Sequence, residues 1–326
     1  HETDRPPVDF GGHRSSGIAA IAYARLKKAL GIHTGDIYIH DMVQQLAIVE
    51  TEVLDALGGD TVELGRGFLL GEDAWKPWVL PDGTPCKIPS FINIEKRGGD
   101  WFLLSDDGLD LAIQKEGMLY FEQIHWPWID RPLEEHDYTG LEDAFRDNMW
   151  SGIAAPGGHL PFTDEGLAEL AAGAKKLHES TDRAIVGLFG GNLFEVPQFF
   201  YRIDNYLLKM GLDPDGCEML SQTLCDFYLP RIEKWLAAVG PYIDVMLFGD
   251  DLGGQNGPLM SPEMYRRYFK PWHTQIWGRA KQIAPRVNIP LHSCGGIEPL
   301  LNDLIEAGLE SENPVQVTSD GMDPTL

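Results

Sequence analysis

The sequence predicts an α/β protein built on a (β/α)8 TIM barrel. Three observations predict this fold. Short apolar runs alternate with helix-length segments along most of the chain, and several runs end in glycine followed by polar residues. The 326 residues, 43% of them hydrophobic, can bury one large core, and barrels of this size form a single domain. We therefore expect one domain over residues 1–326, with its chemistry at the carboxyl ends of the strands.

The first third of the chain opens with a strand over residues 6–10, a glycine-rich loop and a helix over 16–30. A second helix over 42–57 ends at a glycine pair, and a short strand over 61–64 follows it. Between residues 75 and 125, turn signals separate short β-rich runs, which is typical of antiparallel hairpins. We interpret residues 75–125 as a β-rich hairpin insertion in the barrel.

After this insertion, helices and strands alternate again. The predicted helices cover residues 163–178, 218–238, 262–283 and 297–307. The predicted strands cover residues 183–189, 243–248, 287–291 and 310–314. Together with the two earlier strands this makes six barrel strands, whereas a closed barrel of this type needs eight. Three interpretations follow: the count is too low, the sheet is doubly wound, or the chain is a shortened barrel.

Charge and composition exclude several classes of protein. The chain has 26 Lys and Arg against 50 Asp and Glu, a net charge of -24, and such a surface repels nucleic acid and anionic lipid. Four cysteines are too few for a disulfide framework in so long a chain. The sequence shows no apolar run of membrane-spanning length and no secretory signal. We expect a cytoplasmic protein that binds neither nucleic acid nor membranes.

The strongest candidate site lies between Pro290 and Gly296. Side chains alternate along a strand, so His292 and Cys294 are expected to point the same way and Ser293 the other way. An imidazole nitrogen and a thiolate sulfur that project together at the end of a strand supply two of the ligands that zinc prefers. The sequence therefore predicts a zinc site at His292 and Cys294. A packed cysteine beside a hydrogen-bonded histidine is the alternative interpretation.

Two protein ligands hold zinc weakly, so a third ligand is expected. Asp250, Asp251 and Glu312 are candidates for an oxygen ligand at the same edge of the sheet. Cys217 and Cys225 lie eight residues apart on a predicted helix and are expected to pack as small hydrophobic side chains.

Asp250 and Asp251 are also candidates for catalysis. Two adjacent carboxylates at the end of a strand repel each other unless a cation or a hydrogen-bonding substrate meets them. We predict a catalytic role for both, with turn chemistry as the alternative.

Residues after several other predicted strands are candidates for substrate binding. An arginine can bind a carboxylate through two parallel hydrogen bonds, and amide side chains can orient a substrate. The candidates are His13, Arg14, Asn192, Gln255 and Gln316.

Five runs of residues resemble the uroporphyrinogen decarboxylase superfamily, and the resemblance spans nearly the whole chain. It is closer to the branch that includes cobalamin-linked zinc methyltransferases than to the true decarboxylases. The runs cover residues 7–12, 41–46, 249–253, 257–263 and 291–295.

The resemblance implies a (β/α)8 barrel and a zinc ion bound by a His-x-Cys pair and a more distant cysteine. His292 and Cys294 match the first two ligands, and the third would lie beyond Leu326, in two barrel units that this chain lacks. The opening helix of the family would precede His1, so both ends are expected to be truncated.

The implied activity is zinc-dependent methyl transfer between a small substrate or thiol and a corrinoid, or cobalamin, carried by a partner protein. A separate partner is implied because the chain has no corrinoid-binding D-x-H-x-x-G motif. The second alternative is a uroporphyrinogen-type decarboxylase of porphyrin and heme biosynthesis. The decarboxylases carry two arginines after their first strand, whereas this chain has only Arg14 there. A non-catalytic binding barrel is the third alternative.

Overall fold

A computed structural model describes residues 5–67, 71–132, 138–152 and 162–323 of the chain. Contacts between residues divide it into two compact units. The first unit contains His1–His125 and Phe145–Leu188, and the second contains Trp126–Ala144 and Phe189–Leu326. The single domain predicted from the sequence stays a prediction.

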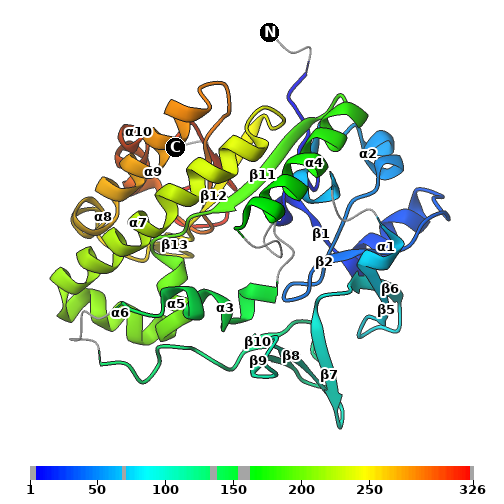
Figure 1. The fold of residues 1–326 in the computed structure, drawn as a ribbon, viewed down its shortest axis with the longest axis horizontal. Helices are drawn as coiled ribbons and strands as arrows, with labels where there is room; N and C mark the ends of the chain where they lie inside the picture. The colour runs from blue at the N-terminus through cyan, green and yellow to red at the C-terminus, as the bar shows by residue number, and fades with distance from the viewer. Residues whose placement is uncertain (1–4, 68–70, 133–137, 153–161, 324–326) are drawn as a thin grey trace. The chain divides into compact units, whose positions relative to one another are not determined.

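The structure is a mixed α/β fold with a five-stranded parallel sheet (Figure 1). The strands follow the order β16-β15-β12-β11-β4. Their bounds are β4 (Thr61–Glu63), β11 (Ala184–Gly190), β12 (Val245–Gly249), β15 (Pro290–His292) and β16 (Ser311–Asn313). Five of the six predicted barrel strands are therefore confirmed as parallel strands.

The predicted strand over residues 6–10 is wrong. These residues lie in the described part of the chain and form no strand. Val8 exchanges hydrogen bonds with Asp60, through its carbonyl to the Asp60 N–H and through its own N–H to the carboxylate. Pro6 and Pro7 precede it and have no N–H to donate, so the contact does not extend into a ladder.

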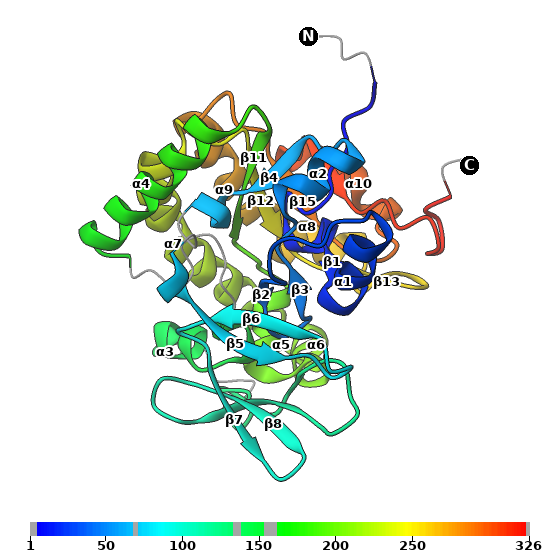
Figure 2. The same ribbon diagram turned by 90° about the vertical axis from the view of Figure 1, so that its right-hand side faces the viewer.

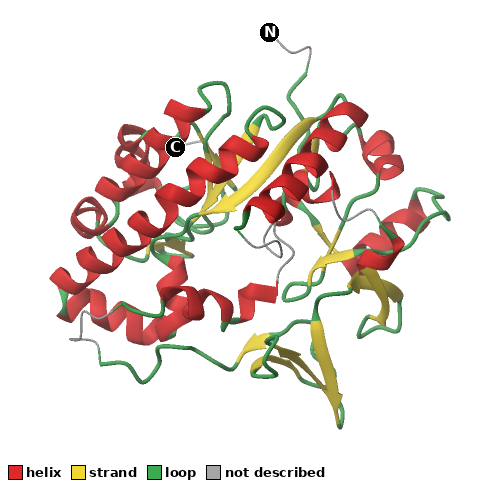
Figure 3. Cartoon of the chain, in the orientation of Figure 1, coloured by secondary structure: helices red, strands yellow, loops and turns green. Residues whose placement is uncertain are grey.

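Two helices of the second unit, α7 (Pro214–Val239) and α8 (Pro262–Tyr268), begin at capping side chains. The Asp213 carboxylate accepts the Gly216 N–H at the start of the longest helix, and the Ser261 hydroxyl accepts the Met264 N–H. These helices appear in red in Figure 3. Their bounds are α5 (Glu195–Tyr201), α6 (Ile203–Leu212), α7 (Pro214–Val239), α8 (Pro262–Tyr268), α9 (Lys270–Ile283), the 3₁₀ turn η5 (Glu298–Leu300) and α10 (Leu301–Ala307).

Two of the predicted helices differ from the structure in a way that has a clear cause. The predicted helix over 262–283 is two helices, because Pro271 in the first turn of α9 cannot continue the α8 hydrogen bonds across Phe269. The predicted helix over 297–307 begins as the turn η5 and becomes α-helical at Leu301.

Aromatic side chains fill the core of the second unit between the strands and the long helices. Phe248 on β12 lies 6.4 Å from Trp277 on α9, measured between ring centroids. Phe189 at the end of β11 lies 5.8 Å from both Phe248 and Trp235, the latter on α7. This packing fixes the end of β12, from which the candidate site begins.

In the first unit the predicted helices over 16–30 and 42–57 are shorter than expected. Residues 18–19 form a strand pair with residues 46–47 instead, and Gln45 has a left-handed backbone (φ 53°). Each helix therefore begins only after its paired residues. The elements are η1 (Arg14–Ser16), β1 (Ile18–Ala19), α1 (Ala20–Ala29), β2 (Ile39–Asp41), β3 (Leu46–Ala47), α2 (Thr51–Leu57), η2 (Leu64–Gly67) and α4 (Asp164–Ser180).

Antiparallel strands occupy the segment that the turn signals marked as β-rich (Figure 2). One hairpin pairs β5 with β6, and a four-stranded sheet has the order β10-β9-β8-β7. The bounds are η3 (Glu72–Ala74), β5 (Trp75–Val79), β6 (Pro85–Pro89), β7 (Asn93–Arg97), β8 (Asp100–Leu104), β9 (Asp110–Gln114) and β10 (Glu122–Gln123). The helical segments that follow are α3 (Leu141–Arg146) and η4 (Met149–Gly152).

No helix in the described residues combines the length and the apolar character needed to cross a bilayer.

Candidate metal centre

Two neighbouring parallel strands bring the strongest candidate residues together. Gly249, the last residue of β12, pairs with His292, the last residue of β15. Asp251 and Cys294 each lie two residues beyond these partners, so both leave the sheet at the same edge. The strand ends therefore place a carboxylate, an imidazole and a thiol side by side, as expected for the carboxyl ends of parallel strands.

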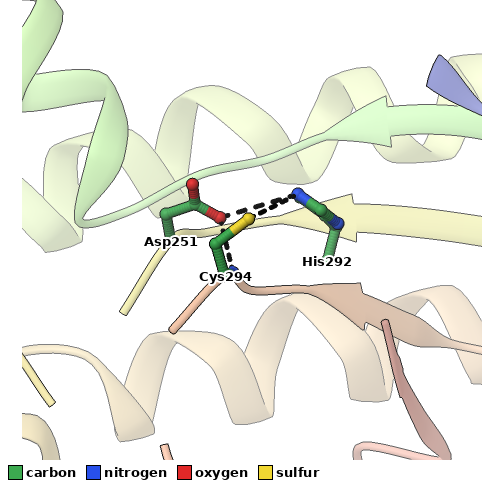
Figure 4. Close-up of side chains that lie close together, drawn as sticks. All are labelled: Asp251, His292 and Cys294. Carbon is green, nitrogen blue, oxygen red and sulfur yellow. Dashed lines mark hydrogen bonds and ion pairs between the residues drawn. The ribbon is translucent and has the colours of Figure 1, made fainter. Parts of the chain in front are cut away.

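Asp251, His292 and Cys294 converge on one point (Figure 4). One ligand atom from each, an oxygen, a nitrogen and a sulfur, lies within 4.8 Å of the other two. The His292 Nε2 is 3.5 Å from the Cys294 Sγ and 3.7 Å from the Asp251 Oδ1. All three residues are half-buried. The prediction that His292 and Cys294 point the same way is confirmed, and the Asp251 carboxylate lies beside them.

Acidic neighbours surround the thiol. Burial raises the pKa of Cys294 to about 12, and the carboxylates of Asp251 and Glu195 add to this effect. Without a cation the thiol therefore keeps its proton at neutral pH. A bound divalent cation would act in the opposite sense, because it favours the thiolate.

Glu195, which the sequence analysis did not single out, belongs to this acidic group. Burial raises its pKa to about 8, with the negative charges of Asp251 and Asp250 as the next causes. Asn192 donates to its Oε2 at 2.6 Å. The predicted substrate-binding residue Asn192 thus holds Glu195. The signal that sequence reasoning overlooked was an acid in the first turn of the helix that follows a glycine-rich strand end.

Asp250 faces away from the three converging residues and holds the start of α5. Its carboxylate is completely buried and accepts the backbone N–H groups of Leu193, Phe194 and Glu195 at 2.7–3.0 Å. His273 approaches it at 3.5 Å. Its oxygens are therefore occupied by backbone donors, as in a helix cap. A catalytic role for Asp250 stays a prediction.

Within the described residues, Asp250 and Asp251 form ion pairs only with histidines. Asp250 pairs with His273 and Asp251 with His292. Asp251 and Glu195 therefore lie around the Cys294 thiol without a lysine or arginine ion pair in the described part of the chain. Such a group repels itself unless it is protonated or binds a cation.

Glycines bring the two loops that carry Asp251 and Cys294 into backbone contact. A Cβ on Gly253 would lie 2.8 Å from the Cys294 carbonyl oxygen and 2.9 Å from the Gly296 nitrogen. The short hairpin of β13 (Gly253–Gly254) and β14 (Gly257–Pro258) therefore packs directly on the loop after β15. Any larger residue at 253 would separate Asp251 from Cys294.

Hydrogen bonds hold the same two loops. The Cys294 N–H donates to Asp251 Oδ1 at 2.8 Å, and the Leu252 N–H donates to the buried Ser293 hydroxyl at 3.0 Å. The two remaining amides proposed for substrate binding differ in their surroundings. Gln316 accepts the Gly295 N–H at 2.9 Å, so it braces a ligand loop, whereas Gln255 is exposed.

The other residues considered as ligands lie elsewhere. Glu312 is on β16 but precedes the partner of His292, so its side chain is on the opposite face of the sheet. Burial raises its pKa to about 7, and its Oε1 has no hydrogen-bond partner within the described residues. Cys217 and Cys225 are buried in α7, where burial raises both pKa values to about 12. The prediction that these two cysteines pack as hydrophobic side chains is confirmed.

His13 and Arg14 lie in the first unit, in a separate buried group. Arg14 Nε is 3.6 Å from the Glu63 Oε1, and His40 Nδ1 is 2.7 Å from the Glu63 Oε2. His13 pairs with Asp9 at 3.5 Å. The charge of Arg14, proposed to bind a substrate, is therefore met by Glu63 within the protein. Burial opposes ionisation of Glu63, but its basic neighbours outweigh burial and lower its pKa.

Comparison of the sequence with protein-family models and with curated proteins finds no match.

Proposed function

We propose that Asp251, His292 and Cys294 bind a zinc ion. The observation that carries this proposal is the convergence of one oxygen, one nitrogen and one sulfur donor within 4.8 Å. Zinc accepts all three donor types, and catalytic zinc sites combine three protein ligands with a fourth position for water or substrate. The acidic surroundings support the fit, because Glu195 and the Cys294 thiol lack a cationic partner in the described chain.

We further propose that the chain is a member of the uroporphyrinogen decarboxylase superfamily and that its parallel sheet is part of a (β/α)8 barrel. The proposed activity is methyl transfer between a small substrate or thiol and a corrinoid carried by a partner protein. Support comes from runs 249–253 and 291–295, which carry the resemblance and contain the three converging residues. Bound zinc would lower the pKa of a thiol substrate and hold it as a thiolate that can accept a methyl group.

The residues of the chain have separate tasks in this proposal. His292, Cys294 and Asp251 would hold the metal. Asp250 fixes the start of α5 through its three backbone hydrogen bonds and so keeps Glu195 beside the site. The glycine contact between the two loops sets the separation of Asp251 and Cys294.

Elemental analysis tests the metal site. We expect about one zinc per chain in the protein purified with its metal, and loss of that zinc in His292→Ala and Cys294→Ser. His33→Ala is the matched control, because His33 is exposed and outside the site. Full zinc content in both site variants would contradict the proposal.

Anaerobic absorption spectroscopy with methyl-cobalamin and a thiol then tests the activity, since the spectrum reports the oxidation state of cobalt. Methyl transfer predicts zinc-dependent formation of cob(I)alamin that is lost in Cys294→Ser. Release of carbon dioxide from a porphyrinogen by metal-free protein would instead identify the decarboxylase. Absence of both reactions in zinc-loaded protein would favour the binding barrel.

A further inference from the structure

Asn313 lies directly beside the imidazole of His292. The two residues are partners in the parallel register of β15 and β16. The Asn313 Oδ1 is 3.0 Å from the His292 Nδ1. An amide oxygen can only accept a hydrogen bond, so the Nδ1 must carry the proton that is donated.

The second nitrogen of the same ring faces the other candidate ligands. His292 Nε2 lies 3.5 Å from the Cys294 Sγ and 3.7 Å from the Asp251 Oδ1. A proton on Nδ1 leaves the lone pair of Nε2 facing these two side chains.

We infer that Asn313 is a positioning residue that holds His292 in the Nδ1–H tautomer, with the lone pair of Nε2 directed toward Asp251 and Cys294. The inference rests on the proposed function, because a zinc ion would bind that lone pair. Histidine ligands of metals commonly donate their other ring N–H to an oxygen behind them, which fixes both the tautomer and the ring plane.

The backbone of Asn313 makes the amide a rigid support. Its carbonyl oxygen accepts the Ser293 N–H at 2.9 Å, so Asn313 is fixed on β16 against the loop that follows β15. Glu312, its neighbour on the strand, projects to the opposite face and contributes nothing to the ring. This difference provides a matched control on the same strand.

Two readouts test the role of Asn313 in the full chain. Two-bond proton–nitrogen spectra of metal-free protein labelled with ¹⁵N-histidine report the tautomer, and His292→Ala identifies the signals of this ring. Competition with a chromophoric chelator measures zinc affinity. The variants are Asn313→Ala, which removes the acceptor, Asn313→Asp, which keeps it, and Glu312→Gln as the control.

We expect the Nδ1–H tautomer in the wild type and a shift toward Nε2–H in Asn313→Ala. Zinc affinity should fall about 10- to 100-fold in Asn313→Ala, stay within a few-fold or rise in Asn313→Asp, and stay unchanged in Glu312→Gln. If the wild type binds zinc but Asn313→Ala changes neither readout, the inference is wrong while the proposed function stands. If the wild type binds no zinc, the proposed function fails, and the tautomer still reports whether Asn313 orients the ring.

Discussion

Two glutamates, one in each unit, show opposite solutions to one electrostatic problem. In the first unit, His40, Arg14 and His13 surround Glu63 and lower its pKa in spite of burial. In the second unit, burial and the acids Asp251 and Asp250 raise the pKa of Glu195 to about 8. Basic side chains of the protein balance the charge of Glu63, whereas acidic side chains lie beside Glu195. This difference makes the group around Glu195 the better candidate for binding a cation.

The largest expected effect comes from removing the charge of each glutamate. Glu63→Gln leaves Arg14 buried without its counter-charge, so the free energy of unfolding should fall by about 3–5 kcal/mol. Glu195→Gln should raise the stability of metal-free protein at pH 7, because only the wild type must keep, in its folded state, a proton that the unfolded state releases. Urea unfolding monitored by circular dichroism measures both. Equal losses in the two variants would contradict the difference between the units.

A pH series on metal-free protein sharpens the same comparison. The folded pKa of Glu195, about 8, lies above its usual value of 4.5, so between these values the folded state binds more protons than the unfolded state. Stability from this group is therefore complete below pH 4.5 and falls as pH rises toward 8, by roughly 1–3 kcal/mol. The lowered pKa of Glu63 has the opposite sign, since its contribution is complete above pH 4.5 and is lost in acid.

The measurement is the difference in unfolding free energy between the wild type and Glu195→Gln from pH 5 to pH 8. We expect the wild type to lose stability relative to the variant as pH rises. Saturating zinc should reduce this loss, because a cation favours the ionised carboxylate. A difference that is flat with pH in metal-free protein would show that Glu195 titrates normally.

Local patterns predicted those parts of the site that depend on one segment. Strand alternation was enough to place His292 and Cys294 on one side, and a glycine-rich strand end was enough to find Asp251. Local patterns could not predict which of Asp250 and Asp251 joins His292 and Cys294. Asp250 turns toward the start of α5, which lies more than fifty residues earlier in the chain. Local patterns also could not predict the contact between Asn313 and His292, because it follows from the register of β15 and β16.

The same reasoning explains the errors in the fold. Buried strands bounded by glycine were predicted well, because apolar runs and turn residues are local properties. Residues 6–10 were predicted as a strand from their place before a glycine pair, although two prolines deprive them of donors. Closure of the sheet into a barrel depends on strand tilt and shear across the whole molecule, which no single segment encodes.

The smallest expected effect is on stability, and it tests whether Gln316 holds a loop in place or binds a substrate. Gln316 and Gln255 were both predicted to bind substrate, but within the described residues only the Gln316 side chain has a hydrogen-bond partner, the Gly295 N–H. Gln316→Ala removes one neutral hydrogen bond and should lower the free energy of unfolding by about 1 kcal/mol, well below the loss expected for a buried ion pair. Gln255→Ala, at an exposed position, should change stability by less than about 0.5 kcal/mol. If Gln316→Ala leaves stability and zinc affinity intact but raises the KM of the substrate, Gln316 acts on the substrate and the loop is held by its glycine contacts alone.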